Sequence, residues 1–131
     1  MSRYLAYPEI VFRDRELLLA ALAELGFAQV EEGEDLPLFG YHGDRRVETA
    51  ALVVRRQHIG PWSNDLGFAR SSQGYYPIVS DYDRETLLGG TFLSRLRVTY
   101  AERVVETVRK RLRGTVHRAT EGSIVKLRVR Y

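Results

Sequence analysis

The sequence contains no cysteine, and it has only three histidines. The absence of cysteine excludes disulfide bonds and thiolate metal sites. The histidines are His42, His58 and His117, and no two of them are spaced three or four residues apart as a helical metal-binding pair would be. We therefore expect no bound metal and no cofactor.

Long hydrophobic runs are also missing. No stretch approaches the roughly 20 apolar residues that span a bilayer, and the N-terminus lacks the apolar core of a secretory signal. The 131 residues are 44% hydrophobic, which is enough for a core, and no linker separates two parts of the chain. The sequence predicts a single soluble domain over residues 1–131, located in the cytoplasm and without contact to a membrane.

The most regular pattern predicts a helix from Phe92 to Arg113 that ends at Gly114. Hydrophobic side chains recur every three or four residues and form one stripe, which consists of Leu93, Leu96, Tyr100, Val104 and Val108. Burying five such side chains at roughly 1.5 to 3 kcal/mol each outweighs any surface ion pair. We therefore expect the stripe to pack against another surface, most simply a sheet.

The remaining chain alternates between strand-like segments and turn residues. Strands are predicted at Arg3–Phe12, Phe27–Glu31, Phe39–His42, Val47–Gln57, Leu66–Arg70, Tyr75–Val79, Thr115–Thr120 and Val125–Tyr131. An earlier helix is predicted from its Asp14 cap to about Leu25, and Asp81 or Asp83 is expected to cap a short helical turn through Leu88. The acidic run from Glu31 to Asp35 is predicted to be a solvated loop.

This order of elements predicts an α+β domain, in which two helices pack on one face of a mostly antiparallel sheet. A decorated ferredoxin-like arrangement is our first choice. Pro8 implies an edge position, a bulge or an early break for the first strand, whereas Ala50 to Val54 is apolar on both alternating faces and belongs inside the sheet.

Several segments resemble one known family. They are Phe12 to Phe27, the run Phe39, Gly40, Tyr41, His42 and Gly43, the tetrapeptide Asp65, Leu66, Gly67 and Phe68, the segment Tyr75 to Asp81, and the ending from Phe92 through Gly122, Ser123 and Ile124 to Tyr131. The chain is similar here to the hypothetical chloroplast reading frame thirty-five group, also called domain of unknown function twelve fifty-seven, of algal plastids, cyanobacteria and other bacteria. The resemblance implies no catalytic residue. Bacterial members often accompany an AAA-type ATPase in the genome, which implies an accessory or adaptor role with that ATPase as partner.

Basic residues are concentrated in the second half of the chain. Residues 1–65 contain 7 basic and 11 acidic side chains, whereas residues 66–131 contain 13 and 6. The basic residues gather near the end of the long helix and on one face of the last predicted strand: Arg109, Lys110, Arg111, Arg113, His117, Arg118, Lys126, Arg128 and Arg130. Cations at a helix C-terminus are stabilised by the helix dipole, and charges protect a strand edge. The functional interpretation is an anionic partner, either an acidic protein surface or nucleic acid.

Patterns of enzyme chemistry are absent from the sequence. No serine lies in a nucleophile elbow, and Gly89 and Gly90 lack the lysine and hydroxyl residue of a phosphate-binding loop. Asp81 and Asp83 have the alternation that could hold a divalent cation, but this pattern more often caps a helix. Our first hypothesis is therefore a non-enzymatic accessory or adaptor domain that acts by protein contact. Nucleic-acid binding, of RNA in particular, is the second, and a small hydrolase or transferase is the third.

Overall fold

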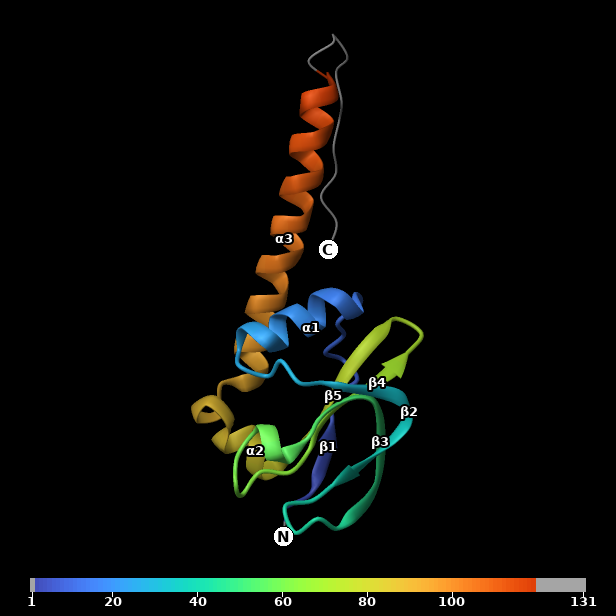
Figure 1. Ribbon diagram of the computed structural model, residues 1–131, viewed down its shortest axis with the longest axis vertical. Coiled ribbons are helices and arrows are strands. Elements are labelled where there is room, and N and C mark those ends of the chain that lie inside the picture. Colours follow the sequence, from blue (N-terminus) through green and yellow to red (C-terminus); the bar gives the residue numbers. More distant parts are fainter. Residues whose placement is uncertain (1, 120–131) are drawn as a thin grey trace.

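A curved five-stranded sheet carries two helices, α1 (Arg15–Glu24) and α3 (Phe92–Ala119), on one side in the computed structural model (Figure 1). The structure describes residues 2–119, and their side chains through residue 114. The strands are β1 (Tyr4–Ala6), β2 (Glu31–Phe39), β3 (Arg45–Val54), β4 (Leu66–Ser71) and β5 (Gly74–Ser80), in the spatial order β1-β5-β4-β3-β2. All neighbouring strands are antiparallel. The predicted α+β class is confirmed, while the ferredoxin-like arrangement stays a prediction.

Helix α1 (Arg15–Glu24) has the limits that its end signals predict. The Asp14 carboxylate accepts a hydrogen bond from the backbone N–H of Leu17 at 3.1 Å, which satisfies one free donor of the first turn. Gly26 follows the helix with a φ of 101°, a conformation that glycine adopts without steric cost. The chain then turns back, so that the N–H of Phe27 donates to the carbonyl of Leu22 at 2.8 Å.

The main core lies between these helices and the sheet. It contains fully or almost fully buried side chains from the segment before α1, from α1 and α3, and from strands β3 and β4: Phe12, Leu18, Leu22, Leu52, Phe68, Phe92 and Leu96. The rings of Phe12 and Phe68 meet edge to face with their centroids 6.1 Å apart. Helix α3 is therefore held at its beginning by the same core that covers the sheet.

A second, smaller cluster occupies the other face of the sheet. It consists of Tyr4, Leu38, Ala50, Val53 and Ile78. Because β3 contributes residues to both clusters, it is buried on both faces and lies inside the sheet, as predicted. The cluster is tight at Gly67, where an added Cβ would lie 2.9 Å from the Cβ of Ala50.

Three predictions for the region around strand β2 are wrong. Residues 27–30 form no strand, and the acidic run expected as a loop is instead the first half of β2. Its residues Glu31 to Asp35 are exposed, and Glu31 pairs with Val53 of β3. The predicted strand Phe39–His42 is also wrong, since Phe39 ends β2 and a turn follows. An edge strand pairs on one side only and therefore tolerates charged side chains that a buried strand would exclude.

The end of the described chain also differs from prediction. The cap of α2 (Asp81–Thr86) is Ser80 rather than either aspartate, and the 3₁₀ turn η2 (Leu87–Gly90) leads to α3 (Phe92–Ala119). Helix α3 continues through Gly114, so the strand predicted from Thr115 is wrong as far as Ala119; one glycine costs only about 1 kcal/mol in a helix. The strand predicted at Val125–Tyr131 lies outside the described residues. No helix within residues 2–119 has both the length and the apolar character of a membrane span.

Candidate functional site

Helix α3 is anchored to the body through its first three turns. The ring of Tyr100 packs edge to face on Phe12 with centroids 5.1 Å apart, and its hydroxyl accepts a hydrogen bond from the backbone N–H of Asp14 at 2.9 Å. One turn later, Nε of Arg103 donates to a carboxylate oxygen of Glu24 on α1 at 3.0 Å. Beyond this ion pair, the later turns of α3 extend away from α1 and the sheet (Figure 1).

The predicted hydrophobic stripe of α3 is therefore divided between two roles. Leu96 is fully buried in the core, and Leu93 packs against it. Val104 and Val108, farther along, are only half-buried. The expectation that the whole stripe packs on the body holds for its first half, because the helix is longer than the surface that supports it.

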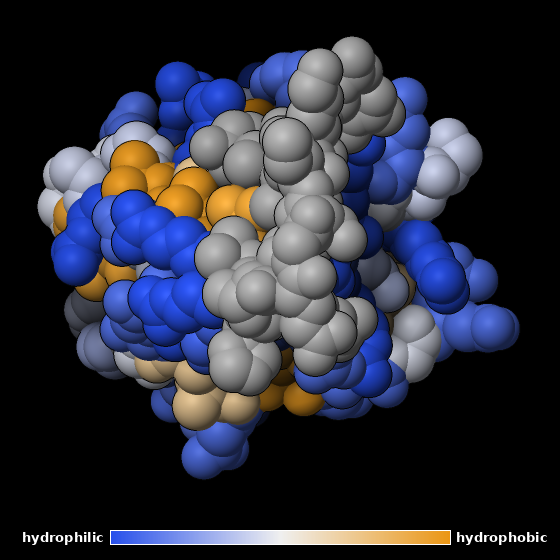
Figure 2. Space-filling view, turned by 90° about the horizontal axis from the view of Figure 1, so that it is seen from above, coloured by the Kyte–Doolittle hydropathy of each residue, from blue (hydrophilic) through white to orange (hydrophobic). Residues whose placement is uncertain are grey.

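An apolar groove runs along the part of α3 where the anchoring ends. Its volume is about 790 Å³, and it is lined by Val98, Tyr100, Ala101, Glu102, Val104, Val105, Glu106 and Arg109. Val98, Ala101 and Val105 follow one another at spacings of three and four residues, so they share a helix face. Val98 is 58% exposed although it is apolar. Viewed from the side towards which α3 extends, the surface that is not drawn in grey shows apolar residues between strongly hydrophilic ones (Figure 2).

The predicted basic residues are only partly placed. Arg109, Lys110, Arg111 and Arg113 are exposed on α3, and Arg109 lies 3.9 Å from the carboxylate of Glu106. His117 and Arg118 belong to α3, but the structure does not describe their side chains. Lys126, Arg128 and Arg130 lie outside the described residues. Successive helix residues are about 100° apart, so Arg109, Lys110 and Arg113 lie within an arc of about 100°, and Arg111 lies about 100° beyond Lys110.

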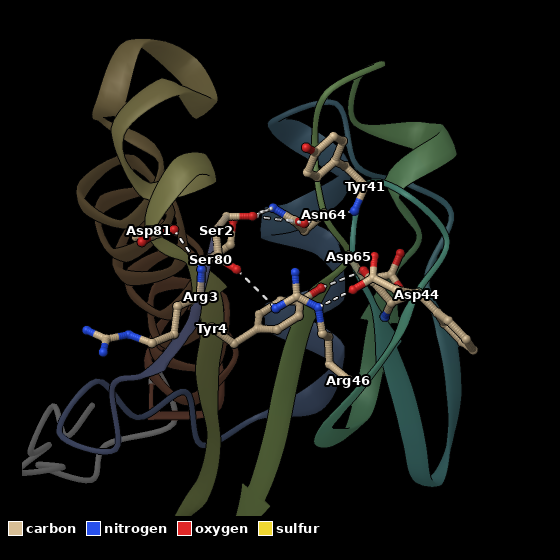
Figure 3. A network of polar contacts seen from close by, with 11 residues as sticks. Ser2, Arg3, Tyr4, Tyr41, Asp44, Arg46, Asn64, Asp65, Ser80 and Asp81 are labelled. Carbon is tan, nitrogen blue, oxygen red and sulfur yellow. Dashed lines mark hydrogen bonds and ion pairs between the residues drawn. The ribbon is translucent and has the colours of Figure 1, made fainter.

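At the opposite end of the molecule, a buried polar cluster joins four segments. The amide of Asn64 donates to Ser2 Oγ at 3.0 Å and to Ser80 Oγ at 2.8 Å, while its oxygen accepts from the N–H of Tyr41 at 2.9 Å (Figure 3). The Asn64 N–H and the Ser80 hydroxyl both donate to Oδ2 of Asp83 at 3.0 Å. Asn64 thereby ties the N-terminal segment, the β2–β3 turn and the start of α2 together.

Asp65 forms a second set of contacts beside this cluster. One of its carboxylate oxygens accepts from the N–H of Phe39 at 2.9 Å and from a guanidinium nitrogen of Arg55 at 2.8 Å, and the other accepts from the N–H of Arg56 at 2.8 Å. Arg55 also contacts the exposed Glu31 at 2.7 Å. These bonds hold together the ends of β2, β3 and β4.

The carboxyl group of Asp83 is almost completely buried, and its Oδ1 has no hydrogen-bond partner in the described structure. Burial raises its pKa above the ordinary value of 3.8, an effect that the hydrogen bonds from Asn64, Ser80 and Ser63 only partly oppose. The folded protein therefore binds this proton more tightly than the unfolded chain does. The stabilisation that the protonated Asp83 contributes to the free energy of unfolding is fully present below pH 3.8 and is lost as the pH rises through the raised pKa.

We expect Asp83→Asn to remove the loss of stability that follows from ionisation of Asp83. The amide oxygen can accept the hydrogen bonds that Oδ2 accepts, and it carries no charge. The free energy of unfolding of the variant minus that of the parent should grow as the pH rises from 3.8 towards neutrality. Urea unfolding of both proteins across this range measures the difference. A difference that does not change with pH would contradict the raised pKa of Asp83.

Neither the histidines nor the aspartates form a metal site in the described part of the chain. No group of three or more histidine, cysteine, aspartate or glutamate side chains is arranged there to hold an ion. His42 and His58 are exposed, and the ring of His42 lies against Tyr41 with centroids 3.9 Å apart. Asp81 accepts hydrogen bonds from the N–H groups of Arg3 and Tyr82.

Sequence reasoning did not identify the polar cluster, although one local signal was available. Ser80 and Asp83 have the spacing of a capping box, a serine followed three residues later by an acidic residue. In the structure the Ser80 hydroxyl accepts from the N–H of Asp83 at 3.1 Å. Asn64 and Asp65 have no comparable local signal, because their partners lie up to 62 positions away.

Comparison with known proteins gives one match. The family model described as "Protein of unknown function (DUF1257)" matches residues 21–123. Neither the curated proteins nor the solved structures contain a match to this chain. The matched region includes Asn64, Ser80 and Asp83 of the polar cluster but not Ser2, and it includes the whole groove and the described basic residues of α3.

Proposed function

Since the chain belongs to the DUF1257 family, whose description names no activity, we propose a function from its surface: a non-enzymatic accessory domain that binds a partner protein through the groove of α3. The observation that supports this proposal most directly is the apolar floor of the groove on a helix that extends beyond the body. Apolar side chains exposed together on one helix face are typical of an interaction surface.

The rim of the groove supports a protein partner. Glu102, Glu106 and Arg109 surround the apolar floor, so both signs of charge lie beside it. Mixed charges around an apolar centre provide orientation and selectivity for a protein surface that carries the complementary charges. The groove extends along about three helical turns, which suits a partner helix laid against it with its own apolar face inward.

As the specific partner we propose an AAA-type ATPase, which the family resemblance implies. The domain would act as an adaptor that docks α3 on the ATPase. In this arrangement the anchoring contacts of Tyr100 and Arg103 fix the direction in which α3 leaves the body. A fixed direction lowers the entropic cost of association.

Binding of nucleic acid, RNA above all, is the second candidate function. The exposed cations Arg109, Lys110, Arg111 and Arg113 favour it, because each could contact a phosphate. Their distribution around the helix presents at most three of the four to one nucleic-acid backbone at a time. Glu102 and Glu106 on the same helix would repel phosphates. The protein partner therefore has the stronger support.

The test is affinity purification from the native cell of the tagged protein, of Val105→Glu in the groove, and of Val47→Glu as a matched control. Val47 is an exposed valine, 93% accessible, on β3 outside the groove. We expect the ATPase to co-purify with the parent and with Val47→Glu. Placing a charge in an apolar contact should reduce its recovery with Val105→Glu at least about tenfold.

Nuclease digestion before the purification separates the two candidate functions. The complex should survive digestion if the contact is between proteins. Loss of the ATPase on digestion, or equal recovery with Val105→Glu and Val47→Glu, would contradict binding through the groove. Absence of an AAA-type ATPase from every sample, with another protein lost only in Val105→Glu, would reject the ATPase and keep the groove.

A further inference from the structure

Three aromatic side chains surround a pocket at the end of the molecule opposite the free end of α3. Tyr41, Trp62 and Tyr82 line it together with Ser2, and its volume is about 340 Å³. They come from the β2–β3 turn, the loop before β4 and helix α2. We call this the aromatic pocket. Its volume is at the lower end of the roughly 300–1,000 Å³ of ligand sites, which suits a short motif better than a large cofactor.

Two of the three rings of the aromatic pocket are exposed, and the third, Tyr41, is half-buried with its ring against His42. Trp62 is 67% exposed, and Tyr82 is also among the large hydrophobic residues that the structure leaves at the surface. Aromatic side chains bury 150–250 Å² each when they are covered, roughly, so a ligand that covers them gains substantial hydrophobic free energy. The surface therefore favours a ligand with apolar rings or chains.

The polar groups of these rings are free to bind a ligand. Within the part of the chain that the structure describes, the hydroxyls of Tyr41 and Tyr82 and the indole N–H of Trp62 make no hydrogen bond with the protein. Each can donate a hydrogen bond, and the indole can only donate. The pocket thus combines ring faces with donors, and none of its four lining residues is charged.

The backbone around the pocket is fixed by the buried polar cluster. The N–H of Tyr41 donates to Asn64 Oδ1 at 2.9 Å, and the hydroxyl of Ser2 contacts the same amide. The N–H of Tyr82 donates to Asp81 at 2.8 Å. Ser2 and Tyr41 are consequently held by Asn64, and Trp62 precedes that residue by two positions, which limits the entropy that a ligand must remove on binding.

We propose that the aromatic pocket binds a proline-rich segment of another protein in the polyproline II conformation. Such a segment has no internal hydrogen bonds, so its carbonyls are available to accept from the Tyr41, Trp62 and Tyr82 donors. Its pyrrolidine rings pack on aromatic faces, and its preformed helix loses little entropy. Phosphate or carboxylate ligands fit poorly because no described residue that lines the pocket is a cation, and a hard metal ion would favour carboxylate ligands, which none of these four side chains supplies.

The fluorescence of Trp62 tests this proposal directly, because it is the only tryptophan of the chain. We expect a proline decamer to change the emission with a saturable curve, and a glycine–serine decamer to leave it unchanged. Tyr82→Ala should weaken binding about tenfold, as the loss of one aromatic contact predicts, and Tyr82→Phe should weaken it less because the ring remains. Val47→Ala, at an exposed apolar position elsewhere, should bind as the parent does.

Three outcomes would overturn the proposal. They are an emission unchanged by the proline decamer, equal affinity of Tyr82→Ala and the parent when both melt at the same temperature, and tighter binding of tetramethylammonium than of the decamer. The last result would make the pocket a cation site. Val105→Glu in the α3 groove should bind the decamer normally, so this result is independent of the function proposed for the groove.

Discussion

Replacing Leu96 with alanine is expected to lower the free energy of unfolding by about 2 to 5 kcal/mol. Leu96 is fully buried in the main core, where α3 meets α1 and the sheet. The change removes apolar contact area and leaves a cavity, since the rigid strands on one side and α1 on the other limit collapse. Urea unfolding followed by circular dichroism measures the effect.

Val105→Ala provides the matched comparison on the same helix. Val105 is half-buried and lines the groove, so its truncation should cost less than about 1 kcal/mol. The contrast between the two positions measures where α3 stops contributing to the fold. Equal destabilisation by both variants would show that the groove is covered and would contradict the proposed binding surface.

Replacing Asp65 with alanine is expected to lower the free energy of unfolding by about 3 to 5 kcal/mol. The Asp65 side chain is 2% exposed and satisfies the N–H groups of Phe39 and Arg56 as well as the guanidinium of Arg55. Its removal leaves these donors without their acceptor at the ends of three strands. An unpaired buried donor costs about 1 to 3 kcal/mol.

Glu31 offers a control for Asp65 because it pairs with the same arginine. The Glu31 side chain is 51% exposed, and water can replace it, so Glu31→Ala should cost less than about 1 kcal/mol. Thermal unfolding of both variants under one buffer condition compares the two partners of Arg55. A similar loss for Glu31→Ala and Asp65→Ala would mean that the charge of Arg55, not the bonds to the backbone, decides the cost.

Local signals account for the parts of the fold that the sequence predicts well. Asp14 and Gly26 mark the ends of α1 because capping depends on neighbouring residues. The hairpin of β4 and β5 follows from alternation around a short turn, and the start of α3 follows from its hydrophobic period. In each case the signal is contained in a short stretch of sequence, so no knowledge of the tertiary structure is needed to find it.

The remaining features depend on partners that are distant in sequence. The acidic residues of β2 become a strand because β3 pairs with them, and the polar cluster exists because Asn64 meets Ser2, Ser80 and Asp83 in space. Local secondary-structure propensity contains no information on these long-range contacts. For the candidate site, the sequence located the cations of α3 but not the groove. The end of the supporting surface, which defines the groove, is a tertiary property.

The exposed acidic half of β2 has a consequence for the behaviour of the protein in concentrated solution. Strand β2 is one edge of the sheet, and its residues Glu31 to Asp35 include four carboxylates. A second molecule that aligned its own β2 there would bring like charges together, and the irregular pairing between Glu32 and Leu36 distorts the strand that it would have to match. Electrostatic repulsion between these carboxylates thus protects the β2 edge against fibrous aggregation. This protection weakens when salt screens the carboxylates or acid protonates them.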